Sequence, residues 1–400
     1  MKIRKLLSEE IDFSIQMSEF AFQYELSSEE RIERREMVKP ENTWVIEENG
    51  EILSKSTTIP LYTYIFGEKI PMGGVSGVVT WPEHRRSGLV KKLLHHSLEE
   101  MRKEGQILSF LYPFSIPFYR KMGWELFAEQ QRITLTKEQL PSRKTEPRGK
   151  VRRVENDYNL IDSVYQTWAK RYLGTLVRDK DWWTTSIFKR KKGRLAVHYN
   201  QSNQPTGYII YQVKDNTMTI KEIIWLDPDA REGLFSFISN HDSMVEKVIW
   251  NTVPHSGMPF LLEDPKVKRE VESYFMARIV DVNEFISLYP FQLSLNDEPL
   301  IIHVYDEFCT WNDGTYFLSS GEGTDKTTKV KFFPSKETGS CLHPPKKGVG
   351  IPVQTLTAVL FNSQSVDVLF KEGLITGEEE AVRKLEESIP KKLPFIYDFF

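Results

Sequence analysis

The stretch of residues 75–90 limits what this chain can fold into more than any other. It reads Val-Ser-Gly-Val-Val-Thr-Trp-Pro-Glu-His-Arg-Arg-Ser-Gly-Leu-Val, an apolar strand that ends in two arginines and a glycine. The apolar residues that follow recur at helical spacing: Leu89, Val90, Leu93, Leu94, Leu98 and Met101. The pattern predicts a strand, a short basic turn and the start of a helix.

The turn formed by Arg85, Arg86, Ser87 and Gly88 has the properties of an anion site. The first amides of a helix lack partners within it, and the helix dipole adds about half a positive charge, so a pyrophosphate is a natural ligand. Gly88 lets the backbone approach the phosphates, and the arginines add charge. An ordinary turn with a solvated arginine pair would carry the same pattern, so both interpretations stand at this point.

A second segment, residues 117–125, reads Pro-Phe-Tyr-Arg-Lys-Met-Gly-Trp-Glu. A short buried strand is predicted before it at residues 108–112, and Pro117 is well placed to open a short helix. This order of basic turn, helix, strand and Phe-Tyr-Arg-Lys-x-Gly-Trp resembles the acetyl-CoA site of the Gcn5-related N-acetyltransferases (GNAT). The sequence departs from the usual Arg/Gln-x-x-Gly-x-Gly/Ala motif at its last position, which Val90 occupies.

The resemblance implies acetyl-CoA as co-substrate, no metal, and Tyr119 as the general acid on the departing CoA thiolate. A tyrosine with a pKa of about 10 is a poor proton donor to a thiolate whose conjugate thiol has a pKa of about 8.5. Either the proton transfer is concerted with bond cleavage, or the surroundings lower the pKa of Tyr119. The alternative is that Tyr119 has no catalytic role and is an aromatic residue of the core. The expected cofactor-binding residues are Val78, Val79, Thr80, Arg85, Arg86, Ser87, Gly88, Leu89 and Val90.

Glycines in the strand before the turn predict an irregularity there. Gly73, Gly74 and Gly77 lie within an apolar run, where glycine often marks a bulge or the close approach of another segment, although simple packing would also explain them. A splay of the strand would free backbone amides for the pantetheine arm and for the thioester oxygen as it gains charge.

Composition bounds the partners and the compartment. The chain has 53 basic and 56 acidic residues, so charge does not favour nucleic acid or a membrane as a partner. The two cysteines, Cys309 and Cys341, show neither metal-ligand spacing nor a disulfide framework. Charged residues within the first ten positions interrupt the apolar segment that a signal peptide needs. These features predict a soluble cytoplasmic protein in a reducing compartment, where acetyl-CoA is available.

The length of 400 residues suggests two or three domains. The first, residues 1–145, is predicted to follow the order β-α-α-β-β-β-α-β-α-β, which is that of the acetyltransferase fold. Ser27 is expected to start its second helix, Asn49-Gly50 to turn a hairpin, and residues 131–135 to close its sheet.

The second domain, residues 150–288, is predicted to repeat the plan of the first. A shift of 145 residues places Arg231-Glu232-Gly233-Leu234 over Arg86-Ser87-Gly88-Leu89, with Ala230 in the place of Arg85. Asp227 and Asp229 lie where a phosphate would need positive charge, and like charges this close repel. The repeat is therefore expected to be a degenerate copy without a cofactor; chance similarity is the alternative.

The third domain, residues 292–400, is expected to be a small α+β unit. Residues 300–305 and 315–319 are strand-like, residues 353–360 and 378–385 are helical, and Thr376 to Glu379 fits a capping box. The overall prediction is an α/β protein of two GNAT-like lobes, the second degenerate, followed by a sterol-carrier-like domain. This order resembles the Eis (enhanced intracellular survival) family, which implies a homo-hexamer and acetylation of aminoglycosides, or of other substrates among relatives of unknown role.

In the Eis family the C-terminal carboxylate folds into the active site, which implies that role for Phe400, with Asp398 and Phe399 presented to the substrate. A free α-carboxyl with a pKa of about 3.5 is a weak base, so it would act through burial, through a water relay, or as an anchor for a cationic substrate. His84 is a second candidate base, although a surface histidine is the more ordinary interpretation. The apolar chain end argues against a frayed tail.

The acceptor side is expected to involve Phe22, Tyr24 and Glu25, which follow the first helix. Trp182 and Trp183 either close the same cleft or pack in the second lobe. Three functions stay open: acetylation of a small polycationic amine such as an aminoglycoside or polyamine, acetylation of a protein lysine or N-terminus, and non-catalytic lipid carriage. Intact cofactor and tyrosine motifs favour the first over the last.

Overall fold

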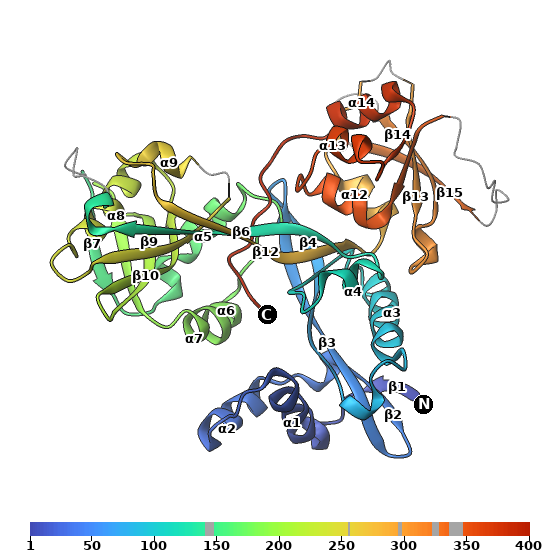
Figure 1. Ribbon diagram of the computed structural model, residues 1–400, viewed down its shortest axis with the longest axis horizontal. Coiled ribbons are helices and arrows are strands. Elements are labelled where there is room, and N and C mark those ends of the chain that lie inside the picture. Colours follow the sequence, from blue (N-terminus) through green and yellow to red (C-terminus); the bar gives the residue numbers. More distant parts are fainter. Residues whose placement is uncertain (141–147, 255–256, 295–297, 322–327, 336–346) are drawn as a thin grey trace.

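The computed structural model describes residues 1–140, 148–254, 257–294, 298–321, 328–335 and 347–400; Cys341 lies outside them. One twelve-stranded sheet, in the order β1-β2-β3-β4-β5-β12-β6-β11-β10-β9-β8-β7, runs through two lobes, and a five-stranded sheet forms a third domain. Figure 1 shows these three bodies in blue, green and orange to red. Within the described residues, no helix has the length and apolar character needed to cross a membrane.

The first lobe has the predicted order of elements. They are β1 (Lys2–Lys5), α1 (Ile11–Phe22), α2 (Ser28–Met37), β2 (Thr43–Glu48), β3 (Glu51–Ile65), β4 (Glu68–Thr80), α3 (Leu89–Lys103), β5 (Leu108–Leu111), α4 (Ile116–Arg120) and β6 (Glu125–Thr136). The Ser27 hydroxyl accepts from the Glu30 amide, as a helix cap should. Asn49 and Gly50 both have positive φ, at +53° and +85°, which suits the predicted hairpin turn.

The two lobes exchange strands. The second lobe contains β7 (Lys150–Val154), α5 (Asp162–Ala169), α6 (Lys180–Trp182), α7 (Phe188–Arg190), β8 (Arg194–Tyr199), β9 (Pro205–Lys214), β10 (Thr217–Trp225), α8 (Pro228–Ser239), β11 (Lys247–Thr252), α9 (Met258–Leu261) and β12 (Lys268–Ile279). Residues 131–135, predicted to close the first sheet, instead pair with β11. The end of β12 takes their place beside β5, because β6 and β12 form one long antiparallel ribbon across both lobes.

The third domain contains the predicted strands and both predicted helices, at residues 353–360 and 379–388. It contains α10 (Val282–Leu288), β13 (Leu300–Tyr305), β14 (Gly314–Ser320), β15 (Thr328–Pro334), β16 (Val349–Pro352), α12 (Val353–Leu360), α13 (Val366–Lys371), β17 (Thr376–Gly377) and α14 (Glu379–Ser388). The predicted capping box is wrong, because Thr376 belongs to β17 and its hydroxyl donates to the Gly350 carbonyl. Glu378 is the residue that precedes the helix, and its side chain makes no cap.

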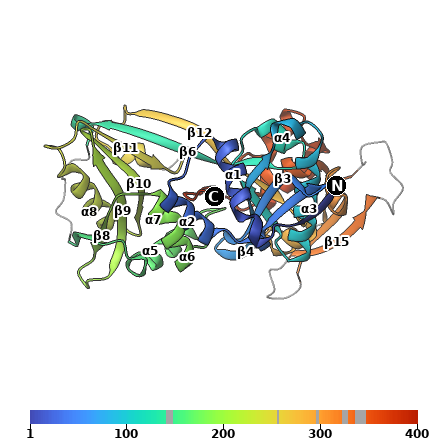
Figure 2. The ribbon, with the colours of Figure 1, turned by 90° about the horizontal axis from the view of Figure 1, so that it is seen from below.

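After α14 the chain leaves the third domain and returns to the space between the lobes (Figures 1 and 2). The backbone of Leu173 holds it on the way: Leu173 donates to the Leu393 carbonyl and accepts from the Phe395 amide, both at 2.9 Å. Phe400 is only 6% exposed, so the last residue is buried rather than frayed.

Candidate active site

The central feature of the first lobe is a splay between two parallel strands. β4 pairs with β5 only over Met72–Val75 and Leu108–Leu111, yet β4 continues to Thr80. Gly77 has φ = +57°, and the register between β3 and β4 shifts at this point, so the predicted bulge is confirmed. From Ser76 onward, the edge of β4 that faces away from β3 has no partner strand among the described residues.

Two further glycines make room for neighbouring segments. A Cβ at Gly73 would lie 2.7 Å from the Met101 sulfur on α3, so this position serves helix packing. A Cβ at Gly74 would lie 2.8 Å from the Phe400 ring. Because Gly74 has no side chain, the ring of the last residue of the chain can pack against its backbone, beside the splay.

The turn after β4 has the geometry of an anion site. Arg86 and Gly88 have positive φ, at +64° and +80°, and Gly88 directly precedes α3 without any side-chain cap. A Cβ placed at Gly88 would meet no atom of the described residues within 4 Å, apart from its chain neighbours and its own helix, so the cradle is open. Arg85, Arg86 and Ser87 are exposed. Free first-turn amides next to two arginines fit the pyrophosphate of acetyl-CoA.

Tyr119 lies on α4 and is 3% exposed. Its ring contacts Phe114, Phe118 and Trp124, with centroids 5.3–6.2 Å apart. Burial raises the pKa of the phenol above its ordinary value. This direction is opposite to an acidified tyrosine, so a proton from Tyr119 could move only in concert with bond cleavage.

The last two residues lie at the splay. The Phe400 ring contacts Phe275 on β12 at 5.1 Å and Trp182 at 6.2 Å, beside Gly74. The Phe399 ring lies 5.0 Å from Tyr112, which directly follows β5, and Phe399 is 39% exposed. The chain therefore presents an apolar end where β4 and β5 separate.

Asp398 does not face a substrate. It is fully buried, and its carboxylate accepts from Arg178 at 2.9 Å and from the Trp182 indole at 2.8 Å. Arg178 also donates two bonds of 2.8 Å to Glu222 on β10. The expected substrate-binding role of Asp398 is therefore replaced by an anchoring one, which fixes the tail in the second lobe.

Sequence reasoning missed Arg178 and Glu222. A signal was present for the second of these, because Lys221 and Glu222 interrupt an apolar stretch of β10 and adjacent strand residues point to opposite faces, so one of the two must point inward. A fully buried acid needs a buried cation, and the sequence alone does not say which arginine supplies it.

The second lobe repeats the splay but not the turn. With the 145-residue shift, β10 pairs in parallel with β11 over Thr217 to Ile220, at the positions that match Met72 to Val75. Gly233, the counterpart of Gly88, lies inside α8 rather than before it. The Asp227 carboxylate accepts from the Ala230 amide at 2.8 Å and so occupies the helix N-terminus.

The chain's own tail fills the second splay. The Tyr397 hydroxyl donates to the Asn251 carbonyl of β11 at 3.2 Å and lies 3.5 Å from the Ile223 carbonyl of β10. Ile223 is the counterpart of Val78, and Glu222 that of Gly77. Tyr397 also stacks on Trp168, with ring centroids 5.4 Å apart.

The remaining predicted residues are more scattered. Phe22 ends α1 and is 53% exposed, Tyr24 is half-buried, and Glu25 is exposed; no contact within the described part of the chain links them to Tyr119 or Phe400. Trp183 is a core residue whose indole donates to Asp162 at 2.7 Å, whereas Trp182 holds the tail.

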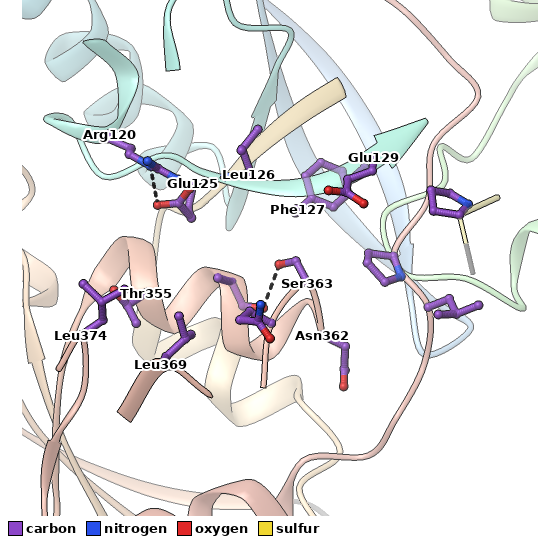
Figure 3. Close-up of a pocket in the computed structure, with 16 residues that line it drawn as sticks. Arg120, Glu125, Leu126, Phe127, Glu129, Thr355, Asn362, Ser363, Leu369 and Leu374 are labelled. Carbon is purple, nitrogen blue, oxygen red and sulfur yellow. Dashed lines mark hydrogen bonds and ion pairs between the residues drawn. The ribbon is translucent and has the colours of Figure 1, made fainter. Parts of the chain in front are cut away.

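A cavity of about 360 Å³ lies between β6 and the third domain (Figure 3). Phe127 and Glu129 line one wall, and Thr355, Asn362 and Leu369 the other. Its described lining includes neither Tyr119 nor the last four residues of the chain. The cavity is thus a feature of the domain junction, separate from the splay.

Comparisons with known proteins agree with this geometry. Models of the acetyltransferase (GNAT) domain match residues 2–127 and 174–279, and a model of the sterol carrier protein domain matches residues 282–397. A probable N-acyltransferase of unknown function from Enterococcus faecalis is 25% identical, with a TM-score of 0.89 over 100% of this chain and 99% of that one.

More distant relatives include the Eis proteins. N-acetyltransferase Eis of Mycobacterium bovis is 20% identical over 70% of this chain and 71% of its own length. The structure of Eis1 from Mycobacterium abscessus shares the fold, with 17% identity and a TM-score of 0.81 over the full length of both chains. An uncharacterized N-acetyltransferase of Streptomyces griseus is 22% identical over 55% of this chain, and the match spans 59% of that relative. The chain therefore contains two acetyltransferase (GNAT) domains ahead of a sterol carrier protein domain, and it shares its fold with Eis1.

Proposed function

We propose that the first lobe transfers the acetyl group of acetyl-CoA to a primary amine of a small molecule. One observation carries the proposal: the splay of β4 from β5 lies between an uncapped helix N-terminus and the buried end of the chain. The anion site and the tail thus flank residues 76–80 of β4, which adjoin β3 but have no partner strand on their other edge within the described residues.

In this proposal the turn and strand hold the co-substrate. The amides of Leu89 and Val90, with Arg85, Arg86, Ser87 and Gly88, receive the pyrophosphate. The unpaired edge of β4 at Val78, Val79 and Thr80 binds the pantetheine arm and the thioester oxygen. Donors placed where negative charge develops favour the transition state over the ground state.

Tyr119 is proposed as the general acid. The acceptor nitrogen forms a C–N bond to the acetyl carbon, the C–S bond breaks, and the tyrosine proton passes to the sulfur. Because burial raises the pKa of Tyr119, the proton moves as the thiolate forms rather than before it. The tyrosinate recovers a proton from the acceptor ammonium, directly or through water.

Phe400 is proposed to place its terminal carboxylate at the acceptor side of the splay. A carboxylate of ordinary pKa is too weak to deprotonate an amine alone, so its role is to anchor and orient the amine. Phe399 and, across the opening, Phe22, Tyr24 and Glu25 complete the acceptor site. On resemblance to the Eis family alone, we extend the proposal to a homo-hexamer.

The test is release of CoA thiol from acetyl-CoA with a panel of primary amines. We expect release that depends on the amine and that Arg85→Ala weakens, while Arg231→Ala in the second lobe leaves it unchanged. Absence of release with every amine, together with lipid uptake by the full chain, would replace catalysis by lipid carriage.

A further inference from the structure

A second cavity, of about 270 Å³, lies beside the tail in the second lobe. Its lining includes Arg190, Lys191 and Lys221, with the amides Gln130 and Asn251 and the ring of Phe399. Among the described residues of this lining, none carries a carboxylate. The cavity therefore presents cations, neutral donors and aromatic rings.

The charges around this cavity do not cancel. Lys191 pairs with Glu222, and Arg178 pairs with both Glu222 and Asp398, so these four groups balance one another. Arg190 and Lys221 have no ion pair within the described part of the chain. The Arg190 guanidinium lies over the Phe399 ring at 5.1 Å, and burial together with the nearby Arg34 lowers its pKa. Two cations are thus left for a ligand.

The cavity begins one side chain away from the splay. Phe399 lines it and also contacts Tyr112 at the end of β5, with ring centroids 5.0 Å apart. Tyr274, another lining residue, lies 5.7 Å from the same Tyr112 ring. A short acceptor with its amine at the splay could therefore extend its other end past Phe399 into the cavity.

Resting on the proposed acetyl transfer, we infer that the acceptor carries an anionic group, a carboxylate or phosphate, which Arg190 and Lys221 bind in this cavity. The acceptor class is then an amino acid-like or amino phosphate-like small molecule rather than a polycation. Asp398, the tail acid that was expected to face a cationic substrate, is already bound by Arg178.

The test compares four amines of similar length: 4-aminobutanoate, 3-aminopropyl phosphate, butylamine and 1,4-diaminobutane. We expect kcat/KM to be at least about tenfold higher for an anionic amine than for butylamine or the diamine, as charge-assisted bonds predict. The ratio between carboxylate and phosphate identifies the anionic group. A preference for the diamine would overturn the inference.

Variants locate the effect. Arg190→Gln combined with Lys221→Gln should raise KM for the anionic amine about tenfold and leave butylamine turnover unchanged. Lys192→Gln, an exposed neighbour outside the lining, is the matched control. An equal loss with all four amines would mean a structural role for the two cations and would overturn the inference.

A binding measurement separates this inference from the proposed function. If no amine is acetylated, the proposed function fails, but calorimetric titration of the full chain with inorganic phosphate still decides the cavity. Binding that weakens about tenfold in the double variant supports the anion site. Absent binding, or equal affinity in the two proteins, contradicts it.

Discussion

The two GNAT lobes share a strand course and differ where the chemistry would be. At matching positions the first lobe has Gly77 in an open bulge and the second has Glu222, bound by Arg178. The first lobe leaves the β4 edge unpaired at Val78, whereas Tyr397 occupies the space beside Ile223. A repeated fold can thus keep its splay while one copy leaves it open and the other fills it with a segment of its own chain.

The residues at one more pair of matching positions, Lys55 in the first lobe and Tyr208 in the second, also differ in their partners. Lys55 pairs in register with Val79, and Tyr208 pairs with Ile224, which is the matching position of the repeat. The Lys55 ammonium donates to the hydroxyls of Ser14 and Ser18 on α1. The Tyr208 hydroxyl donates to Glu222 instead. The first lobe thus ties its strand to α1, and the second ties its strand to the buried acids that hold the tail.

The largest expected effect comes from breaking the tail anchor. Arg178→Met leaves Asp398 and Glu222 as buried carboxylates without their main partner, which costs about 3–5 kcal/mol of unfolding free energy. Denaturant titration of the full chain measures the loss. Arg171→Met, at an exposed arginine that donates to the backbone carbonyls of Trp225 and Leu226, is the control. An unchanged stability would show that the anchor has little structural weight.

The same anchor predicts an acid dependence. Burial alone would raise the pKa of Glu222, but Arg178 and Lys191 lower it well below its ordinary value. Because the folded-state pKa is below the unfolded value of about 4.3, this stabilisation is full at neutral pH and is lost as the pH falls below about 4. Denaturation midpoints measured from pH 7 to pH 3 should decline more steeply in the wild type than in Glu222→Gln.

Altering the chain end should reduce turnover about a thousandfold, because the tail orients the acceptor. Deleting Phe400, or appending several residues to it, should do this with acetyl-CoA binding intact. Phe400→Leu should keep more activity than the deletion, since the carboxylate remains. An extended chain that turns over at the wild-type rate would show that the terminal carboxylate is dispensable for turnover.

Tyr119→Phe should lower kcat about a hundredfold or more, the usual contribution of a general acid, with CoA affinity nearly unchanged. Stopped-time thiol assays measure the rate, and Tyr397→Phe in the second lobe serves as a contrast that should affect stability more than chemistry. Full activity in Tyr119→Phe would assign protonation of the thiolate to water.

The smallest effect concerns the basic turn. Arg85→Ala should weaken acetyl-CoA binding by about 1–3 kcal/mol, through loss of a charge-assisted bond to phosphate. Arg231→Ala, at the counterpart of Arg86 in the second lobe, should not change acetyl-CoA binding. Arg231 pairs with Glu232, and Asp227 already caps the helix beside it. Equal losses in the two variants would erase the distinction between the lobes.

Local patterns in the sequence were sufficient for the elements around the first site. The turn at Gly88, the cap at Ser27 and the bulge at Gly77 each depend on neighbouring residues, and each is found in the structure. Thr376 shows the limit of such patterns. Its sequence is that of a capping box, but in the structure Thr376 pairs in β17 with β16, a strand distant in sequence.

Features that join distant segments could not be predicted in this way. The exchange of β6 and β12 depends on a ribbon that spans both lobes. The sequence of residues 131–135 is compatible with a strand in either lobe, so it does not indicate which strand it pairs with. Arg178 and Asp398 are 220 residues apart, and no local pattern pairs them. The acidic character of Asp398 suggested a substrate contact because its buried partner was not visible in the sequence.

The most direct test of the account is the number of CoA molecules that one chain binds. Calorimetric titration of the full chain with CoA should give one site, which Arg85→Ala weakens and Arg231→Ala does not. Two equivalent sites per chain would contradict the account, because Tyr397 and Asp227 would then fail to exclude the cofactor from the second lobe.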